Sequence, residues 1–425
     1  GGVELGTLQC LENDSADPDT AGFEDTESPA AGEAFFYLAR FNAAPGAGSW
    51  GGSSRNRDRF PFVQDPTIAD WFVESDQEGA WMGSSAYQAG DVNGDGYDDV
   101  IVAAQHYDND LTDEGRAFVY QGSPTGLSTT AAWTAESDQS GSRYGWSAST
   151  AGDVNGDGYD DVIVGAPGYD GDLATEGAAF VYMGSSSGVE GVRAWSAEGD
   201  QTDSDFGYRV RPAGDVNDDG YDDVIIGAYR YDTPEHFNAG RASVWLGSSD
   251  GLQAGPADWW YEGTQVQAQA GMGVGSAGDV NGDGYGDVVV GVHQYSNGET
   301  REGRVLVFHG SASGLPAMPD AEMEFDVVEA RFGYAVETAG DVNGDGYDDI
   351  VVGAQTYTNG ENEEGAVFVF LGSPDGIVTT PAWSFESDHP GAKLGIAVAS
   401  AGDTNGDGYD DIVVGAYRHG GEHRT

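Results

Sequence analysis

Asp91–Asp99 reads DVNGDGYDD, and this nine-residue sequence is repeated along the chain. Identical or closely similar copies begin at five further aspartates: Asp153, Asp215, Asp279, Asp341 and Asp403. Successive copies start 62, 62, 64, 62 and 62 residues apart. Repetition at one long period predicts an array of equivalent structural units.

Each unit contains the same order of predicted strands. A first strand of small residues leads into the nine-residue loop, as in Tyr334–Gly340, and an apolar second strand follows, as in DIVVGA at Asp349–Ala354. The third strand is exemplified by Gly365–Leu371 and the fourth, which carries tryptophan, by Ala382–Asp388. Runs of β-branched residues predict second strands that are buried on both faces. Four short strands in about 60 residues indicate one blade of an all-β propeller.

The number of blades depends on the two ends of the chain. The third strand follows a loop only five times, but Gly32–Leu38 (GEAFFYL) matches it, and Ala69–Asp76 matches the fourth strand. These two segments would complete the last blade and give six blades. The alternative is that Gly32–Phe41 belongs to a preceding module. We expect residues 1–31 to form an acidic linker or tail, residues 32–68 to hold this strand and an irregular segment, and residues 69–425 to form the propeller.

The loop chemistry indicates calcium. Positions 1, 3, 5, 6, 7 and 9 are Asp, Asn, Asp, Gly, Tyr and Asp in every copy, whereas positions 2, 4 and 8 vary. Calcium takes six to eight hard oxygen ligands, which side chains at positions 1, 3, 5 and 9 and the carbonyl of position 7 could supply. A metal-free turn does not require carboxylates at fixed odd positions in six copies. We expect the side chains at positions 2, 4 and 8 to point outward.

The prediction is therefore about six structural Ca²⁺ ions, one in each loop. The predicted ligands are Asp91, Asn93, Asp95, Tyr97, Asp99, Asp153, Asn155, Asp157, Tyr159, Asp161, Asp215, Asn217, Asp219, Tyr221, Asp223, Asp279, Asn281, Asp283, Tyr285, Asp287, Asp341, Asn343, Asp345, Tyr347, Asp349, Asp403, Asn405, Asp407, Tyr409 and Asp411.

Composition excludes several classes of partner. The formal net charge is −56, with only 17 Lys and Arg residues, which argues against binding of nucleic acid or of an anionic membrane surface. No apolar stretch is long enough to span a bilayer. The seven histidines are scattered, and Gly184–Gly188, which formally matches a hydrolase elbow, follows a third strand. We expect no enzymatic activity.

The loops resemble those of FG-GAP repeats, which form the N-terminal propeller of integrin α-chains and of bacterial relatives. The FG element is present at Phe206-Gly207 and Phe332-Gly333, and the GAP element is complete at Gly165-Ala166-Pro167. The resemblance implies calcium binding on one face, a role in adhesion, and usually seven blades, whereas six loops are present here. It also suggests a secreted or cell-surface protein of bacterial type. A second resemblance, of Glu33–Pro61 to the end of β-sandwich modules in secreted bacterial proteins, favours the preceding-module alternative.

An aromatic residue recurs sixteen positions after the start of each loop. These residues are Tyr107, Tyr169, Tyr231, Tyr295, Tyr357 and His419. They either pack between strands or form a ligand-binding ring on the face opposite the loops.

Three functions are compatible with the sequence. The first is a calcium-stabilised extracellular binding or adhesion module that recognises protein or carbohydrate. The second is a structural subunit of a filament or matrix, in which residues 32–76 complete the last blade of a neighbouring copy. The third is a non-catalytic scaffold within a larger secreted enzyme.

Overall fold

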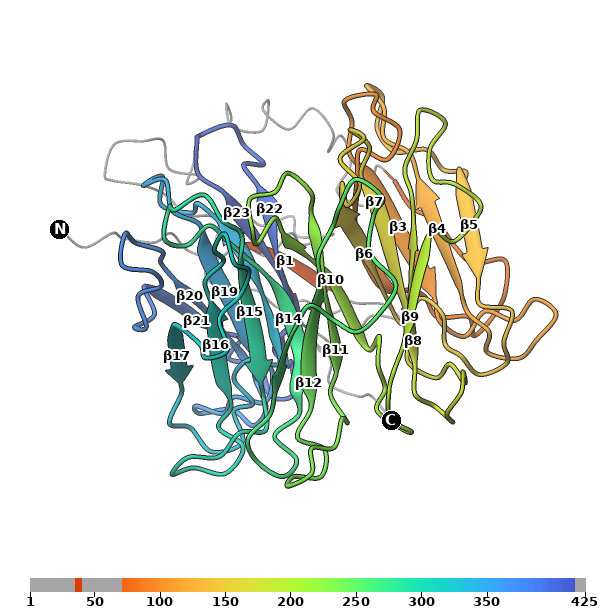
Figure 1. Ribbon diagram of the computed structural model, residues 1–425. Coiled ribbons are helices and arrows are strands. Elements are labelled where there is room, and N and C mark those ends of the chain that lie inside the picture. The colour runs from red at the N-terminus through yellow and green to blue at the C-terminus, as the bar shows by residue number, and fades with distance from the viewer. Residues whose placement is uncertain (1–34, 40–70, 417–425) are drawn as a thin grey trace, which may run out of the picture.

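The computed structural model describes residues 35–39 and 71–416, and its regular elements are all β-strands. The strands form six antiparallel sheets, which stand side by side as the blades of a propeller (Figure 1). Within the described residues, no helix is long and apolar enough to cross a membrane.

Blades one to five each contain four strands in sequence order. Blade one consists of β2 (Met82–Gly90), β3 (Asp99–Ala104), β4 (Arg116–Tyr120) and β5 (Trp133–Glu136). Blade two consists of β6 (Ser147–Gly152), β7 (Asp161–Ala166), β8 (Ala178–Tyr182) and β9 (Trp195–Glu198). Blade three consists of β10 (Arg209–Gly214), β11 (Asp223–Ala228), β12 (Arg241–Trp245) and β13 (Trp259–Glu262).

The next two blades repeat this pattern. Blade four consists of β14 (Ala270–Gly278), β15 (Asp287–Val292), β16 (Arg304–Phe308) and β17 (Ala321–Glu324). Blade five consists of β18 (Ala335–Gly340), β19 (Asp349–Ala354), β20 (Ala366–Phe370) and β21 (Trp383–Glu386). The sequence-based order of strands is thus confirmed in each complete unit.

Blade six joins the two ends of the chain. It contains β22 (Leu394–Gly402) and β23 (Asp411–Ala416), and β1 (Phe35–Ala39) pairs antiparallel with β23. Figure 1 shows β1, at the red end of the colour scale, with the blue strands from the other end of the chain. β1 therefore occupies the position of a third strand, as expected if Gly32–Leu38 completes the last blade. The fourth-strand candidate Ala69–Asp76 lies partly outside the described residues, and its described part, residues 71–76, forms no strand.

Trp71 nevertheless makes the contact that fourth-strand tryptophans make. Its indole Nε1–H donates to the carbonyl of Ser128 in the next blade at 2.8 Å. The corresponding bonds from Trp133 to Glu190 and from Trp195 to Gln253 measure 2.9 and 3.0 Å. Trp71 thus packs on blade one as the preceding blade's tryptophan does elsewhere.

The apolar core lies between neighbouring blades. All six residues of β7 are buried, as the β-branched run predicted, and the same holds for β11, β15 and β19. One continuous cluster combines Ile101 of blade one with Val162 and Phe180 of blade two. These four second strands are therefore covered on both faces by adjacent sheets.

A polar cluster links non-adjacent blades across the propeller axis. Nε of Arg211 on β10 donates to Oε2 of Glu337 on β18 at 3.2 Å. The Arg211 guanidinium also lies 4.4 Å from the ring centroid of Tyr87 on β2. Burial raises the pKa of Glu337 to about 7, although Arg211 and the Tyr87 hydroxyl lower it. Side chains from blades one, three and five thus meet at the centre.

Candidate functional site

The six predicted calcium loops connect the first and second strands of the blades. Loop Asp341–Asp349, for example, links β18 to β19, and its ninth residue is the first residue of β19. Gly340, just before the loop, has a φ of +69°, and the strand register shifts between Thr338 and Gly340. A bulge with glycine in this left-handed conformation turns the chain out of the first strand.

Side-chain oxygens at positions 1 and 5 bind the backbone of their own loop in all six copies. In the first loop, Oδ2 of Asp91 accepts from the amide N–H of Gly96 at 2.7 Å, and Oδ1 of Asp95 accepts from that of Tyr97 at 3.1 Å. The equivalent bonds from Asp403 and Asp407 in the last loop measure 2.8 and 3.2 Å. These bonds hold the carboxylates of positions 1 and 5 close to one another along the turn.

The aspartate at position 9 is buried and anchors the loop to two strands. Oδ2 of Asp161 accepts from the amide of Val154 in the same loop at 3.0 Å, and Oδ1 accepts from that of Gly184, after β8, at 2.8 Å. Burial, together with the charges of Asp153 and Asp157, raises the pKa of Asp161 to about 7, although its two backbone hydrogen bonds lower it. The same causes raise the pKa of Asp349 to about 8.

The residues present fit a calcium ion by their chemistry. The carboxylates and the asparagine carbonyl of each loop offer oxygen ligands, which calcium prefers. Burial is the main cause of the raised pKa values of Asp161 and Asp349, and neighbouring carboxylates, whose charge a cation would neutralise, add to it. Within the described residues, however, no group of three or more His, Cys, Asp and Glu side chains is gathered closely enough to hold a metal. Backbone carbonyls, asparagine and water would therefore have to supply part of the coordination.

The expectation that positions 2, 4 and 8 point outward is wrong for most of the loops, although Asp98 at position 8 and Thr404 at position 2 are exposed. Val154, at position 2, is fully buried in the core. A side chain at Gly94, at position 4, would meet the ring of Tyr159 from the next loop. Asp160, at position 8, reaches back to the first loop, where its Oδ2 accepts from the amide of Asp91 at 2.8 Å. These positions join the loop to the core and to the neighbouring loop.

The recurring aromatic residues pack against the core on the opposite edge of the sheets. Tyr169 contacts the ring of Phe180 at 5.6 Å, and the guanidinium of Arg241 lies 3.6 Å from the ring centroid of Tyr231. Tyr295 and Tyr357 likewise pack on core clusters. His419 lies outside the described residues. Binding of a ligand by these residues remains a prediction.

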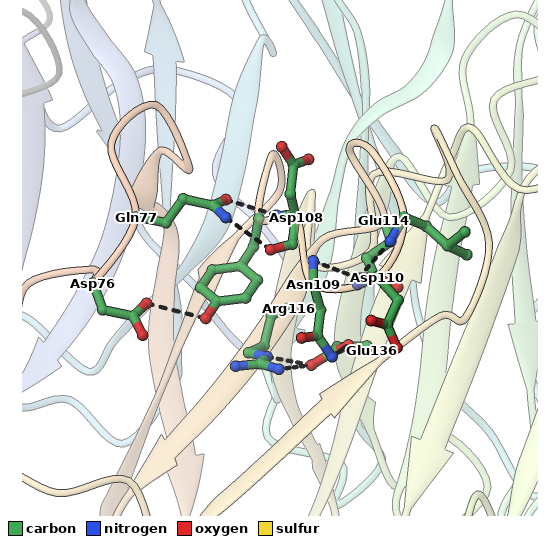
Figure 2. Close-up of polar contacts among 10 residues, drawn as sticks. Asp76, Gln77, Asp108, Asn109, Asp110, Glu114, Arg116 and Glu136 are labelled. Carbon is green, nitrogen blue, oxygen red and sulfur yellow. Dashed lines mark hydrogen bonds and ion pairs between the residues drawn. The ribbon is translucent and has the colours of Figure 1, made fainter.

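Tyr107 shows how this edge is bonded. Its hydroxyl donates to Asp76 at 3.0 Å, while Gln77 exchanges two hydrogen bonds with the backbone of Asp108 (Figure 2). Figure 2 also shows Glu114 accepting from amides of its own connection, including that of Asn109 at 2.6 Å. Residues before β2 thus close over blade one.

Family models match more than half of the chain. FG-GAP repeats match residues 206–245, 271–308, 332–370 and 394–424, and an FG-GAP-like repeat matches residues 91–164.

The relatives found by sequence include integrin α-chains from animals. Integrin alpha pat-2 of Caenorhabditis briggsae is 33% identical over 235 residues, which are 51% of this chain and 18% of the relative. Integrin alpha-PS2 of Drosophila melanogaster is 33% identical over 254 residues, which are 56% and 16%. Integrin alpha-8 of Gallus gallus is 30% identical over 212 residues, which are 48% and 19%. The chain thus spans about a fifth of the length of these relatives, and they lend no support to a bacterial origin.

Solved structures give weaker likenesses. Saccharomyces cerevisiae Sqt1 has a TM-score of 0.42 at 9% identity, covering 75% of this chain and 69% of that one. The exotype rhamnogalacturonan lyase YesX has a TM-score of 0.30 at 12% identity, covering 77% and 55%. Neither value supports an argument about function.

The repeat matches, the integrin relatives and the bladed fold agree: the chain belongs to the FG-GAP repeat family, which includes the N-terminal β-propeller of integrin α-chains.

Proposed function

We propose that this chain is a calcium-stabilised extracellular binding module, on a secreted or cell-surface protein, that recognises protein or carbohydrate. The observation that carries the calcium proposal is the common loop geometry. In all six loops the carboxylates at positions 1 and 5 are fixed by the loop backbone, at bond lengths of 2.7–2.9 and 3.1–3.2 Å. An aspartate at position 9 is buried beneath them.

Bound calcium would neutralise these carboxylates and link each loop to its second strand. Side-chain oxygens of positions 1, 3 and 5, with the carbonyl of position 7, would hold the ion, and the carboxylate of position 9 would hold it from below. The amide of Val154 and that of Gly184 keep the Asp161 carboxylate in place. Without a cation, the like charges oppose one another and loop stability decreases.

The binding role is supported by the integrin relatives, which share sequence similarity over about half of this chain. A rigid propeller presents many connecting loops from a stable scaffold, and such loops are where binding residues concentrate. The strongly negative charge makes nucleic acid an unsuitable partner.

Thermal melting in excess EGTA and in millimolar calcium tests the calcium proposal. We expect a higher Tm in calcium, because a ligand that binds only the native state stabilises it by about 2.7 kcal/mol per site at a hundred times its Kd. Calorimetric titration of the calcium-free chain should give about six sites. Identical melting curves in the two buffers would contradict structural calcium. Screening immobilised extracellular-matrix proteins and glycans, with calcium present, tests the recognition role.

Assembly through strand exchange is a second candidate. β1 and β23 pair although they come from opposite ends of the described chain. Exchange of this pairing between copies would produce a head-to-tail polymer. Size-exclusion chromatography in calcium distinguishes a monomeric binding module from a strand-exchanged filament. A stable monomer contradicts the filament, and a ladder of oligomers favours it.

A further inference from the structure

A cavity of about 500 Å³ lies between blades two and three. β9 of blade two lines one side with Ala197 and Glu198, and β12 of blade three lines the other with Ser243 and Trp245. Trp260 of β13 stands at its rim and is 54% exposed. This volume is within the range of sites that bind small ligands.

The cavity exists because Ser243 replaces a large side chain. Strand register identifies the equivalent residue in each blade, since Ser243 pairs with Ile226 as Phe180 pairs with Val164 in blade two. The residues equivalent to Ser243 are Phe118 in blade one, Phe180 in blade two, Leu306 in blade four and Phe368 in blade five.

In other blades, this large residue fills the space between two aromatic side chains. Phe180 contacts Tyr144 at 5.7 Å and Tyr169 at 5.6 Å. Phe368 likewise contacts Phe332 at 5.7 Å and Tyr357 at 6.3 Å. In blade three the corresponding aromatic residues, Phe206 and Tyr231, both line the cavity.

The facing strand does not compensate for the missing ring. Ala197 faces the cavity from β9. The residues at the equivalent fourth-strand position of blades three, four and five are large: Tyr261, Met323 and Phe385. Ala135, the equivalent residue of blade one, is also small, but it packs on the cluster that contains Phe180. Small residues thus face each other only between blades two and three, among the complete blades.

The lining combines aromatic faces with hydrogen-bonding groups. Arg241 binds Asp200 at 3.1 Å through Nη1 and Glu262 at 2.6 Å through Nη2, whereas its buried Nε–H has no partner among the described residues. In the part of the chain that the structure describes, the same Nε–H is also unpartnered at Arg304 of blade four, where Leu306 stands in place of Ser243. The cavity, and not the arginine, therefore distinguishes blade three.

We propose that this cavity binds one neutral sugar residue of a glycan. The C–H face of a sugar ring can pack on Trp260 and Tyr231, as amphipathic ligands pack on aromatic side chains. Its hydroxyls can donate to the exposed carboxylate of Asp200, which lines the cavity. The Asp200 carboxylate in the lining and a net charge of −56 disfavour an anionic ligand. The inference rests on the proposed binding role and specifies a ligand class for it.

Saturation-transfer NMR on the full chain in calcium tests this inference. The probes are the methyl glycosides of glucose, galactose, mannose and N-acetylglucosamine, each at millimolar concentration. We expect at least one to receive saturation, and S243F to abolish the signal because phenylalanine fills the cavity. This residue already occupies the position in three other blades, so the Tm should not fall.

Two tryptophan variants provide a matched comparison. W260A should weaken binding of the methyl glycoside at least fivefold. W81A removes an exposed tryptophan far from the cavity in sequence, at the start of blade one, and should leave glycoside binding unchanged. Undiminished binding by both S243F and W260A would overturn the inference, as would the absence of a signal from all four glycosides. If the chain still melts at higher temperature in calcium in that case, the cavity inference fails while the calcium proposal stands.

Discussion

Oδ2 of Asp160 accepts a hydrogen bond from the backbone N–H of Asp91 at 2.8 Å, which joins the second calcium loop to the first. The amide of Asp160 in turn donates to the carbonyl of Asp91 at 3.3 Å. The side-chain bond recurs from Asp222, Asp348 and Asp410 to the preceding loops. Neighbouring loops are thus bonded to each other as well as to their own strands.

Replacement of Asp160 by Ala should lower the free energy of unfolding by about 1–2 kcal/mol in saturating calcium, because the Asp91 amide loses a charged acceptor. Asp98 occupies the same loop position in blade one, is exposed, and has no such bond within the described residues. Asp98→Ala is therefore the matched control and should change stability by less than about 0.5 kcal/mol. Urea denaturation measures both values, and equal losses would contradict the proposed role of position 8.

Two glycines at position 4 allow loop packing to be measured separately from backbone strain. Gly94 and Gly406 both have a φ of +70°, so alanine is strained at either site. A Cβ at Gly94 would lie 2.7 Å from the Tyr159 ring, whereas one at Gly406 would meet nothing within 4 Å. We expect Gly94→Ala to cost about 1–3 kcal/mol more than Gly406→Ala. Similar costs would show that Tyr159 does not hold the first loop.

The buried Glu337 should make stability depend on pH. Burial raises its pKa from 4.5 to about 7. The native state therefore holds a proton that the unfolded state releases, and the resulting stability is lost as pH rises through the native pKa. Between about pH 5 and pH 8, wild type should lose stability relative to Glu337→Gln. Denaturation of both proteins at the two pH values, in saturating calcium, measures this difference. Parallel profiles would indicate that the Glu337 proton makes no contribution.

The sequence predicts the elements of a blade because each is encoded locally. DIVVGA at Asp349–Ala354 is β19, with the predicted boundaries, since a short β-branched run bounded by turn residues favours a strand over a helix. The pairing of β1 (Phe35–Ala39) with the last second strand agrees with the match of the segment around it to other third strands.

Contacts between repeats could not be read from a single repeat. Asp160 was expected to face solvent because position 8 tolerates glycine at Gly286, yet its partner lies 69 residues away in the preceding loop. The sequence shows that Ser243 stands at a third-strand position that holds phenylalanine or leucine in the other complete blades. Whether this small residue leaves a cavity depends on Ala197, which comes from a different blade. Such contacts require the arrangement of the blades in space.

An anomalous difference map from crystals grown in calcium tests the calcium proposal most directly. We expect six peaks, one in each loop, bounded by the side chains of positions 1, 3 and 5 and the carbonyl of position 7. In the first loop these residues are Asp91, Asn93, Asp95 and Tyr97. Loops that contain only water in such crystals would contradict it.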